Sequence, residues 1–331
     1  MTNHKQPTGF AIAIAWPETY CKQPGYWYDA LSDFLGFSEN HYYKVGHAAL
    51  VLIDPETCKC HYFDFGRYHS PFQHGRVRSE ATDDGLKMKT SASISEDDRK
   101  IENFEEILTE LQLNPECHGE GKIHASYNRI NFQRAYSRAF YLQQKSPIPY
   151  GPFRYKGSNC SRFVNSVLRA GNPSWGPTFK LNFGVPLTPT PMNNVNSFEN
   201  KVVLPKLLTK APFCTAPISD KSKLKGTLPE TARPKDIPEF AQWLSGEGSG
   251  SWFSIRWKEN DKYFISRFGP NGELECEDEF QISNNQSFNI RIPFQFEHLS
   301  HCRNVRIRQE KLLVEFIRIE YGKLTMVVHR R

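Results

Sequence analysis

One cysteine in the sequence, Cys160, stands where a thiolate nucleophile would be activated. It follows Ser158 and Asn159, which are both good residues for capping the start of a helix. Apolar residues then recur at helical spacing until Gly171, namely Phe163, Val164, Val167 and Leu168. The unpaired N–H groups and the positive dipole at a helix start lower the pKa of a thiol, and the thiolate is the reactive species. Cys160 is therefore a candidate nucleophile, with a small core cysteine as the alternative.

A histidine that could act as the base for this thiol lies at the start of an apolar strand. His47 follows Gly46, and we expect a strand over residues 46–53, a turn at residues 54–57 and a returning strand over residues 60–65. Asp-Pro begins turns, and both arms are rich in apolar and aromatic residues, so the pattern predicts a hairpin. A histidine at the first position of such a strand can face a cleft. His47 is the candidate base, and a structural strand histidine is the alternative.

Cysteine catalysis also needs a third group that holds the imidazole in the useful tautomer. His61 is expected to share a face with His47, because the two positions differ by an even number and side chains alternate along a strand. Asp64 is the other candidate, unless it pairs with Arg67 close by in the sequence. The sequence leaves the choice between His61 and Asp64 open.

Two tyrosines and three arginines could bind the substrate. Tyr150 and Tyr155 precede the cysteine helix and could donate to an oxyanion, although tyrosines in such places more often bond a backbone carbonyl. Arg67, Arg76 and Arg78 fall in stretches that read as loops. A guanidinium pairs with a carboxylate or a phosphate through two hydrogen bonds, so these arginines could hold an acidic substrate or lie in a solvated loop.

The elements that must position these residues are mainly strands first and helices later. A strand over residues 10–16 is expected first, followed later by the hairpin that carries His47. Amphipathic periodicity predicts, besides the helix that begins at Cys160, three helices over residues 26–35, 100–113 and 131–145. Pro147 and Pro149 break the chain before the cysteine helix. Strands, helices and then the cysteine helix are typical of an α+β fold.

The order of these motifs resembles a known family. A histidine on a hairpin comes first, and Asn-Cys-x-x-Phe-Val-Asn at 159–165 and Leu-Arg-x-Gly at 168–171 come later. This order resembles the circularly permuted NlpC-type papain-like family, in particular its lecithin:retinol acyltransferase branch, over roughly residues 40 to 172. The resemblance implies an antiparallel sheet packed on helices, with Cys160 as the nucleophile, His47 as the base and His61 as the orienting residue.

Two departures separate the sequence from that branch. Ser161-Arg162 stands where the branch has Glu-His, and the hairpin between the histidines is longer, so the substrate class is not carried over. We also expect the chain as a whole to belong to a bacterial family.

The composition of the chain changes twice along its length. Residues 1–175 hold the expected permuted papain-like domain, and residues 176–240 are rich in Pro, Thr, Asn and Lys, which predicts a linker or an extended wrap. From residue 241 to residue 331, apolar and polar residues alternate around turn signals such as Pro270-Asn271-Gly272. We therefore predict a C-terminal antiparallel β domain.

The overall composition bears on whether this chain binds nucleic acid, enters a membrane or forms disulfides. Its 331 residues carry a net charge of +6, and we read Lys and Arg as scattered among Asp and Glu, so no nucleic acid partner is expected. No apolar run reaches 18 residues, and residues 10–16 are too short to cross a bilayer, so we expect no stable membrane insertion and a cytoplasmic protein. The eight cysteines show no repeated spacing, which favours reduced thiols.

Cofactors are not required by the expected chemistry. Cys58-Lys59-Cys60-His61 has no second Cys/His pair at zinc-site spacing, so neither a metal nor an organic cofactor is expected. We predict a cysteine-dependent hydrolase or acyltransferase that attacks an amide, ester or thioester and forms an acyl-enzyme at Cys160. A small peptide or an acylated small molecule is the expected partner, with amide or small-peptide hydrolysis favoured. The alternative is a non-catalytic binding or scaffold protein on a papain-like core.

Overall fold

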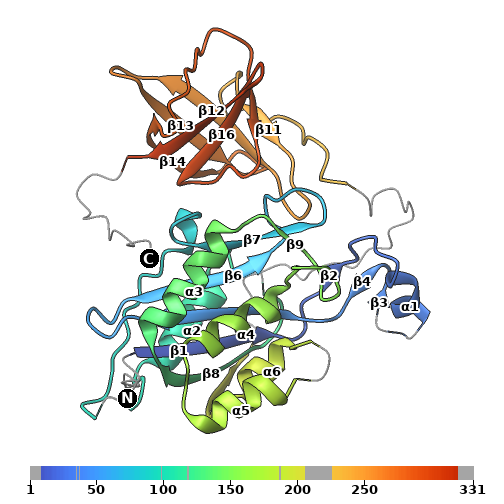
Figure 1. Cartoon of the computed structure of the whole chain (residues 1–331), viewed down its shortest axis with the longest axis vertical. Helices are drawn as coiled ribbons and strands as arrows, with labels where there is room; N and C mark the ends of the chain where they lie inside the picture. Colours follow the sequence, from blue (N-terminus) through green and yellow to red (C-terminus); the bar gives the residue numbers. More distant parts are fainter. Residues whose placement is uncertain are drawn as a thin grey trace. The chain divides into compact units, whose positions relative to one another are not determined.

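The computed structural model describes residues 9–34, 36, 38–97, 99–117, 119–185, 188–205 and 226–319. The chain forms two compact units (Figure 1). Unit 1 comprises Met1–Pro229 together with the short segment Ser245–Ser249. Unit 2 comprises Glu230–Leu244 and Gly250–Arg331. Both are built mostly on antiparallel sheets, and unit 1 adds helices, so the fold is mixed helix and sheet.

Unit 1 is organised around a seven-stranded antiparallel sheet in the order β10-β8-β1-β5-β6-β7-β9. Every residue of the central strand β1 is buried, because helices and loops cover both faces of the sheet. The expected strand at 10–16 and the expected hairpin are confirmed. The strands are β1 (Gly9–Trp16), β5 (His47–Ile53), β6 (Cys60–Gly66), β7 (His74–Ser79), β8 (Ile123–Ile130), β9 (Ile148–Pro149) and β10 (Asn200–Leu204).

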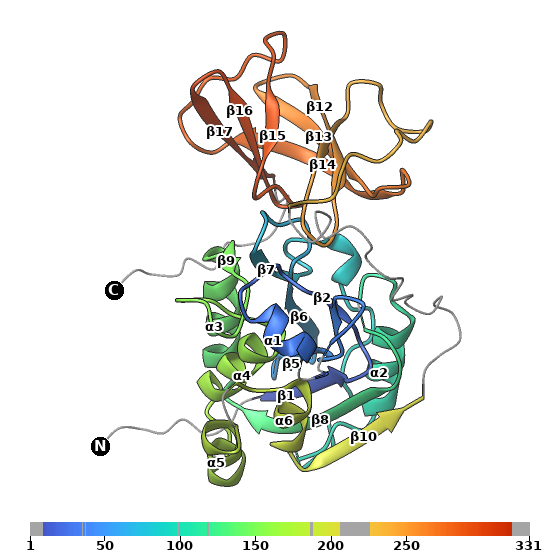
Figure 2. The same cartoon turned by 90° about the vertical axis from the view of Figure 1, so that its right-hand side faces the viewer.

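The two faces of this sheet carry two different cores. Large residues of β1 (Phe10, Ile12, Ile14 and Trp16) join the core that includes α2, and the intervening alanines Ala11, Ala13 and Ala15 join the core that includes α3 and α4. Helices α3 and α4 thus lie on the opposite side of the sheet from α2 (Figure 2). The helices are α2 (Phe104–Leu113), α3 (Phe132–Gln144), α4 (Cys160–Ala170), α5 (Trp175–Phe183) and α6 (Pro191–Asn196).

All four expected helices are present, and the first two are shorter than expected, since α2 begins at Phe104 instead of residue 100. Helix α1 (Asp29–Phe34) begins three residues late because the Asp29 carboxylate accepts the N–H of Tyr26 and holds the preceding residues in a turn. A small three-stranded sheet joins β2 (Cys21–Lys22), β4 (Tyr42–Tyr43) and β3 (Ser38–Glu39). A short 3₁₀ helix, η1, spans Asp84–Leu86.

Part of the segment expected as a linker, residues 176–240, is folded into unit 1. Helices α5 and α6 lie in it, and β10 pairs with β8 at the edge of the main sheet. Proline did not prevent helix formation, because Pro191 occupies the first turn of α6, where its missing N–H needs no partner. The Thr190 side chain caps the same helix in a reciprocal arrangement with Asn193. Residues 206–225 lie outside the described residues.

Unit 2 is a seven-stranded antiparallel sheet in the order β11-β12-β13-β14-β17-β16-β15, which agrees with the expected β-rich C-terminal domain. Its edge strands β11 and β15 approach each other, because the Gln242 side chain donates to the carbonyl of Phe294 and accepts the N–H of Phe296. The sheet is therefore nearly closed. The strands are β11 (Gln242–Leu244), β12 (Ser251–Trp257), β13 (Lys262–Phe268), β14 (Leu274–Ile282), β15 (Gln295–Glu297), β16 (Asn304–Gln309) and β17 (Leu312–Arg318).

One cysteine pair departs from the expected reduced state. Cys276 and Cys302 form a disulfide in unit 2, with their Cα atoms 5.9 Å apart. Sequence spacing did not reveal this pair, because Cys276 lies on β14 and Cys302 in the connection before β16, and only the tertiary fold brings them together. Among the described residues, no helix combines the length and the apolar character needed to cross a membrane.

Candidate functional site

Cys160 is the first residue of α4, as the sequence predicted. The Asn159 side chain caps the helix by accepting the N–H of Arg162 at 2.8 Å. The Cys160 side chain is 8% exposed and lies in the core on the helical side of the sheet, with its sulfur 3.8 Å from the Ser161 hydroxyl. The cap therefore fixes a mostly buried thiol at the positive end of a helix.

His47, the first residue of β5, lies between this thiol and a buried carboxylate. The Nε2 atom of His47 is 3.6 Å from an oxygen of Asp64, and the imidazole is close enough to Cys160 for each side chain to shift the pKa of the other. Because Nε2 faces the carboxylate, Nδ1 is the nitrogen left to face the sulfur. The backbone N–H of Ala48, next to the histidine, also acts to lower the pKa of the thiol. Cys160, His47 and Asp64 are thus adjacent in the order that thiol catalysis requires.

His61 does not share a face with His47, so that expectation is wrong. The register pairs Leu52 with His61 and Ala49 with Asp64. The two numbers of each pair add to an odd number, so even-numbered residues of β6 lie on the same face as odd-numbered residues of β5. Asp64 therefore shares a face with His47, and His61 lies on the opposite face. The His61 ring instead packs near Phe132 and bonds the Glu80 carboxylate at 3.0 Å.

Asp64 is held rigidly by two neighbours on its own face of the sheet. Its two carboxylate oxygens accept from Nε and Nη2 of Arg78 at 3.0 and 2.6 Å, and the Tyr62 hydroxyl donates at 3.1 Å. Its side chain is completely buried. Burial by itself raises the pKa of Asp64, but the charge of Arg78 and the nearby imidazole of His47 hold it well below its usual value. Asp64 is therefore a fixed anion beside the imidazole.

The thiol and the imidazole shift each other's pKa in opposite directions. Burial raises the pKa of Cys160 and lowers that of His47, and the hydrogen bond and charge between them act against burial in both cases. The net result is a pKa of about 9 for His47, to which Asp64 also contributes, and a lowered pKa for Cys160. The imidazole therefore holds its proton near neutral pH, and the thiolate of Cys160 forms more readily than that of an isolated thiol.

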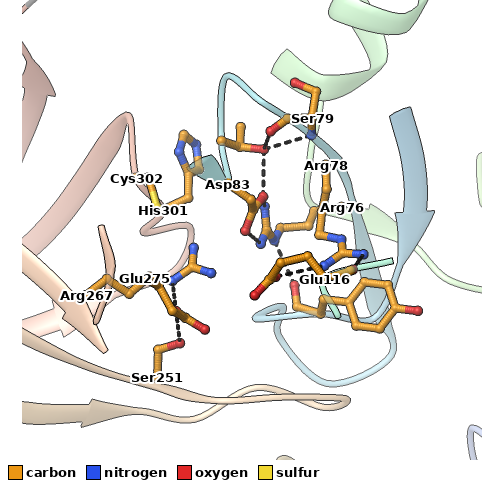
Figure 3. A network of polar contacts seen from close by, with 12 residues as sticks. Arg76, Arg78, Ser79, Asp83, Glu116, Ser251, Arg267, Glu275, His301 and Cys302 are labelled. Atoms are coloured by element: carbon orange, nitrogen blue, oxygen red, sulfur yellow. Dashed lines mark hydrogen bonds and ion pairs between the residues drawn. The ribbon is translucent and has the colours of Figure 1, made fainter. Parts of the chain in front are cut away.

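The three arginines lie in buried ion pairs and not in solvated loops. Arg76 and Arg78 belong to β7, and each guanidinium is 1% exposed. Figure 3 shows Arg76 against Asp83, which it bonds with both Nη atoms at 2.7 and 2.6 Å. Arg76 therefore does not lie where it could bind a substrate carboxylate, and Arg78 serves Asp64 instead. The stretch 75–78 was misread because alternating arginines on a buried strand look like a polar loop.

Arg67 and Tyr150 do reach the neighbourhood of the thiol. Both line a pocket of about 460 Å³ that also contains Cys160 and His47. The Arg67 guanidinium lies 4.9 Å from the centre of the Tyr150 ring and pairs with the buried carboxylate of Glu247. Tyr155, by contrast, is 84% exposed and does not line this pocket.

Several residues around the site were missed by sequence reasoning. The Trp16 ring stacks on His47 with 5.8 Å between ring centres, and Tyr68 approaches the same imidazole edge-on at 6.4 Å. Cys21 lines the pocket and accepts from Arg67 at 3.2 Å. Only Trp16 carried a usable signal, since it ends an apolar strand next to the histidine strand. The other charged residues of the pocket wall are Lys22, Glu120 and Glu247.

In the part of the chain that the structure describes, no group of three or more His, Cys, Asp or Glu side chains is arranged to hold a metal ion.

The candidate site lies in the part of the chain that matches the model of a known protein family. Residues 11–175 match the family model described as type VI secretion system effector TseH-like. This region is similar to the TseH-like effectors. It contains Cys160, His47 and Asp64. Residues 241–319 match the DUF6695 C-terminal domain, and no curated protein matches the chain.

One solved structure is similar as well. The crystal structure of the type VI secretion system effector TseH shares 21% sequence identity with this chain, with a TM-score of 0.40. The match covers 61% of this chain and 95% of that one.

Proposed function

We propose that unit 1 is a papain-like cysteine hydrolase with Cys160 as nucleophile, His47 as acid and base, and Asp64 as the orienting residue. The observation that carries the proposal is the position of His47 between a capped, mostly buried thiol and a fixed carboxylate. The similarity of residues 11–175 to TseH-like effectors supports it, because the three residues lie within that region.

The proposed reaction has two steps. The Cys160 thiolate attacks a carbonyl carbon, and the imidazolium of His47 gives its proton to the leaving group as the acyl–sulfur bond replaces the bond to that group. Neutral His47 then takes a proton from water, the hydroxide displaces the sulfur, and the carboxylic acid leaves. Backbone N–H groups in the first turn of α4 are suited to hold the oxyanion.

Amide or small-peptide bonds are the favoured substrates. An amine is a poor leaving group unless it is protonated, and a His47 pKa of about 9 keeps the required proton available at neutral pH. A pocket of about 460 Å³ accommodates a small peptide or an acylated small molecule. Since the family is named for type VI secretion effectors, we also propose that the chain acts after export, in place of the cytoplasmic location expected from sequence.

Alkylation kinetics test the nucleophile. Iodoacetamide should label Cys160 faster than the other cysteines near neutral pH, because His47 lowers the pKa of its thiol. His47→Ala should slow the labelling and move its rise to higher pH, since burial alone raises that pKa. Site-resolved mass spectrometry over a pH series measures both effects. Equal labelling of all accessible thiols would contradict the proposal.

A second measurement separates an enzyme from a binding protein. Incubation with p-nitrophenyl acetate should add an acetyl group to Cys160 that disappears with time, as seen in the intact mass. The Cys160→Ser variant should lack the fast addition. A thiol that is reactive toward iodoacetamide yet never carries a transient acetyl group would favour the non-catalytic alternative.

A further inference from the structure

Charge is distributed very unevenly along unit 1, contrary to the even mixture expected from the sequence. Between Glu120 and Glu199 the chain contains ten Lys and Arg residues and no Asp or Glu, whereas the net charge of the whole chain is only +6. This acid-free stretch contains α3, α4 and α5. One side of unit 1 is therefore built from elements that carry positive charge alone.

Five of these cations surround a single groove of about 830 Å³. Arg138 comes from α3, Arg162 and Arg169 come from α4, and Lys145 and Lys156 come from the connection between the two helices. No residue that lines this groove also lines the pocket of Cys160. The groove is therefore a second, separate concavity of unit 1.

The cations of the groove have no carboxylate partners among the described residues. Arg138 donates to the Ser166 hydroxyl at 2.9 Å, and Arg162 donates to the carbonyl of Pro152 at 2.9 Å. Lys145 lies over the ring of Tyr141, 5.6 Å from its centre. Neutral partners orient these groups but leave their charges uncompensated. An anion from another molecule would balance the positive charge of this surface.

The lining of the groove indicates which kind of anion fits. Apolar side chains that are not fully buried line it together with the cations, namely Tyr141, Leu142, Pro147, Val185 and Pro189. A nucleic acid backbone needs only the cations and would leave the exposed parts of these side chains uncovered. A polypeptide with acidic residues and apolar anchors matches both parts, since protein interfaces combine an apolar centre with a polar rim.

We propose that this groove docks an acidic, amphipathic segment of a partner protein. The inference does not depend on Cys160 chemistry, because it concerns a different concavity and different side chains. The proposal rests on three observations, which are the acid-free stretch, the groove with its cations and the apolar side chains that line this groove.

Fluorescence anisotropy on the full chain tests this proposal. The probe is a short fluorescein-labelled peptide of Glu, Leu and Ala, compared with a peptide of equal charge made of Glu and Ser. The Leu-containing peptide should bind more tightly, and added salt should weaken its binding. Lys145→Glu combined with Arg169→Glu should weaken binding by about tenfold or more, because both exposed cations become repulsive.

A matched control keeps the total charge change the same. Arg134 and Lys180 are exposed cations of α3 and α5 that do not line the groove. Arg134→Glu combined with Lys180→Glu should leave peptide binding within about twofold. Equal losses in both double variants, equal binding of the two peptides, or no binding at low salt each overturn the proposal. Tighter binding of a single-stranded DNA oligonucleotide of equal charge overturns it in favour of a nucleic acid site.

Discussion

At the scale of single residues, the site depends on a chain of buried charges. Arg78 fixes Asp64, Asp64 supports the charged form of His47, and His47 lowers the pKa of Cys160. The first member, Arg78, has no role of its own in the proposed chemistry and does not line the pocket of Cys160. The reactivity of the thiol should therefore depend on residues that lie beyond its own contacts.

The two candidates for the orienting residue can be separated by one pair of variants. Asp64→Asn should slow iodoacetamide labelling of Cys160 at pH 7 by about tenfold or more, because the imidazolium loses its buried counter-charge and its pKa falls. His61→Ala should leave the rate unchanged, since His61 contacts Glu80 and not the site. Circular dichroism checks that both variants are folded. A larger effect from His61→Ala than from Asp64→Asn would contradict the assignment of Asp64 as the orienting residue.

At the scale of elements, hairpin geometry decided what the sequence could predict. Both arms of the hairpin were predicted because their apolar content is local information. The register was not, because six residues connect the paired positions Ile53 and Cys60. One residue more or fewer would have moved His61 to the face of His47. The conformation of the connection sets how many residues separate the paired positions, and it includes Cys58 with a positive φ of 55°.

Other elements were missed for equally local reasons. Strand β8 mixes polar and apolar residues without clean alternation, so no period identified it. Its place between β1 and β10 comes from pairing over long sequence distances. The helix of Cys160 was predicted to within a residue, since its cap, apolar stripe and stop are all contained in thirteen consecutive positions, 159–171.

Two asparagine caps offer a test of how α4 serves the thiol. Asn159→Ala should lower the free energy of unfolding by about 1 kcal/mol and also slow labelling of Cys160, because the helix start no longer holds the sulfur in place. Asn131 caps α3 in the same way, by accepting the N–H of Arg134 at 3.0 Å. Asn131→Ala should cost similar stability without slowing the labelling. Equal labelling rates in the two variants would show that the cap has no role at the site.

At the scale of the whole molecule, unit 1 is not continuous in sequence. Ser245–Ser249 belongs to unit 1 although it lies between two strands of unit 2. Within this segment, the Glu247 carboxylate pairs with Arg67 and accepts the N–H of Gln73 at 2.6 Å, and the N–H of Gly248 donates to the carbonyl of Arg67 at 2.7 Å. A residue far along the chain thus completes the wall of the Cys160 pocket.

This buried pair predicts a stability effect. Glu247→Ala should lower the free energy of unfolding by about 3–5 kcal/mol, because it leaves the Arg67 charge buried without its partner. Arg67→Met combined with Glu247→Met should recover much of the loss, since neither charge then remains. Urea denaturation measures both. Arg308→Ala, which breaks an exposed pair in unit 2, should produce no measurable change. No loss in Glu247→Ala would mean that the segment does not stabilise the pocket.

The alternation along β1 has a consequence for how this protein tolerates substitution. Ala11, Ala13 and Ala15 face the core shared with α3, α4 and α6, so the helices pack against methyl groups on this strand. Any larger side chain there would push the helices outward and move the Cys160 sulfur away from the His47 imidazole. None of the three alanines lines the Cys160 pocket. In a saturation survey of variants, these positions should therefore behave like functional sites, and a map of intolerant positions would point to a strand that performs no chemistry.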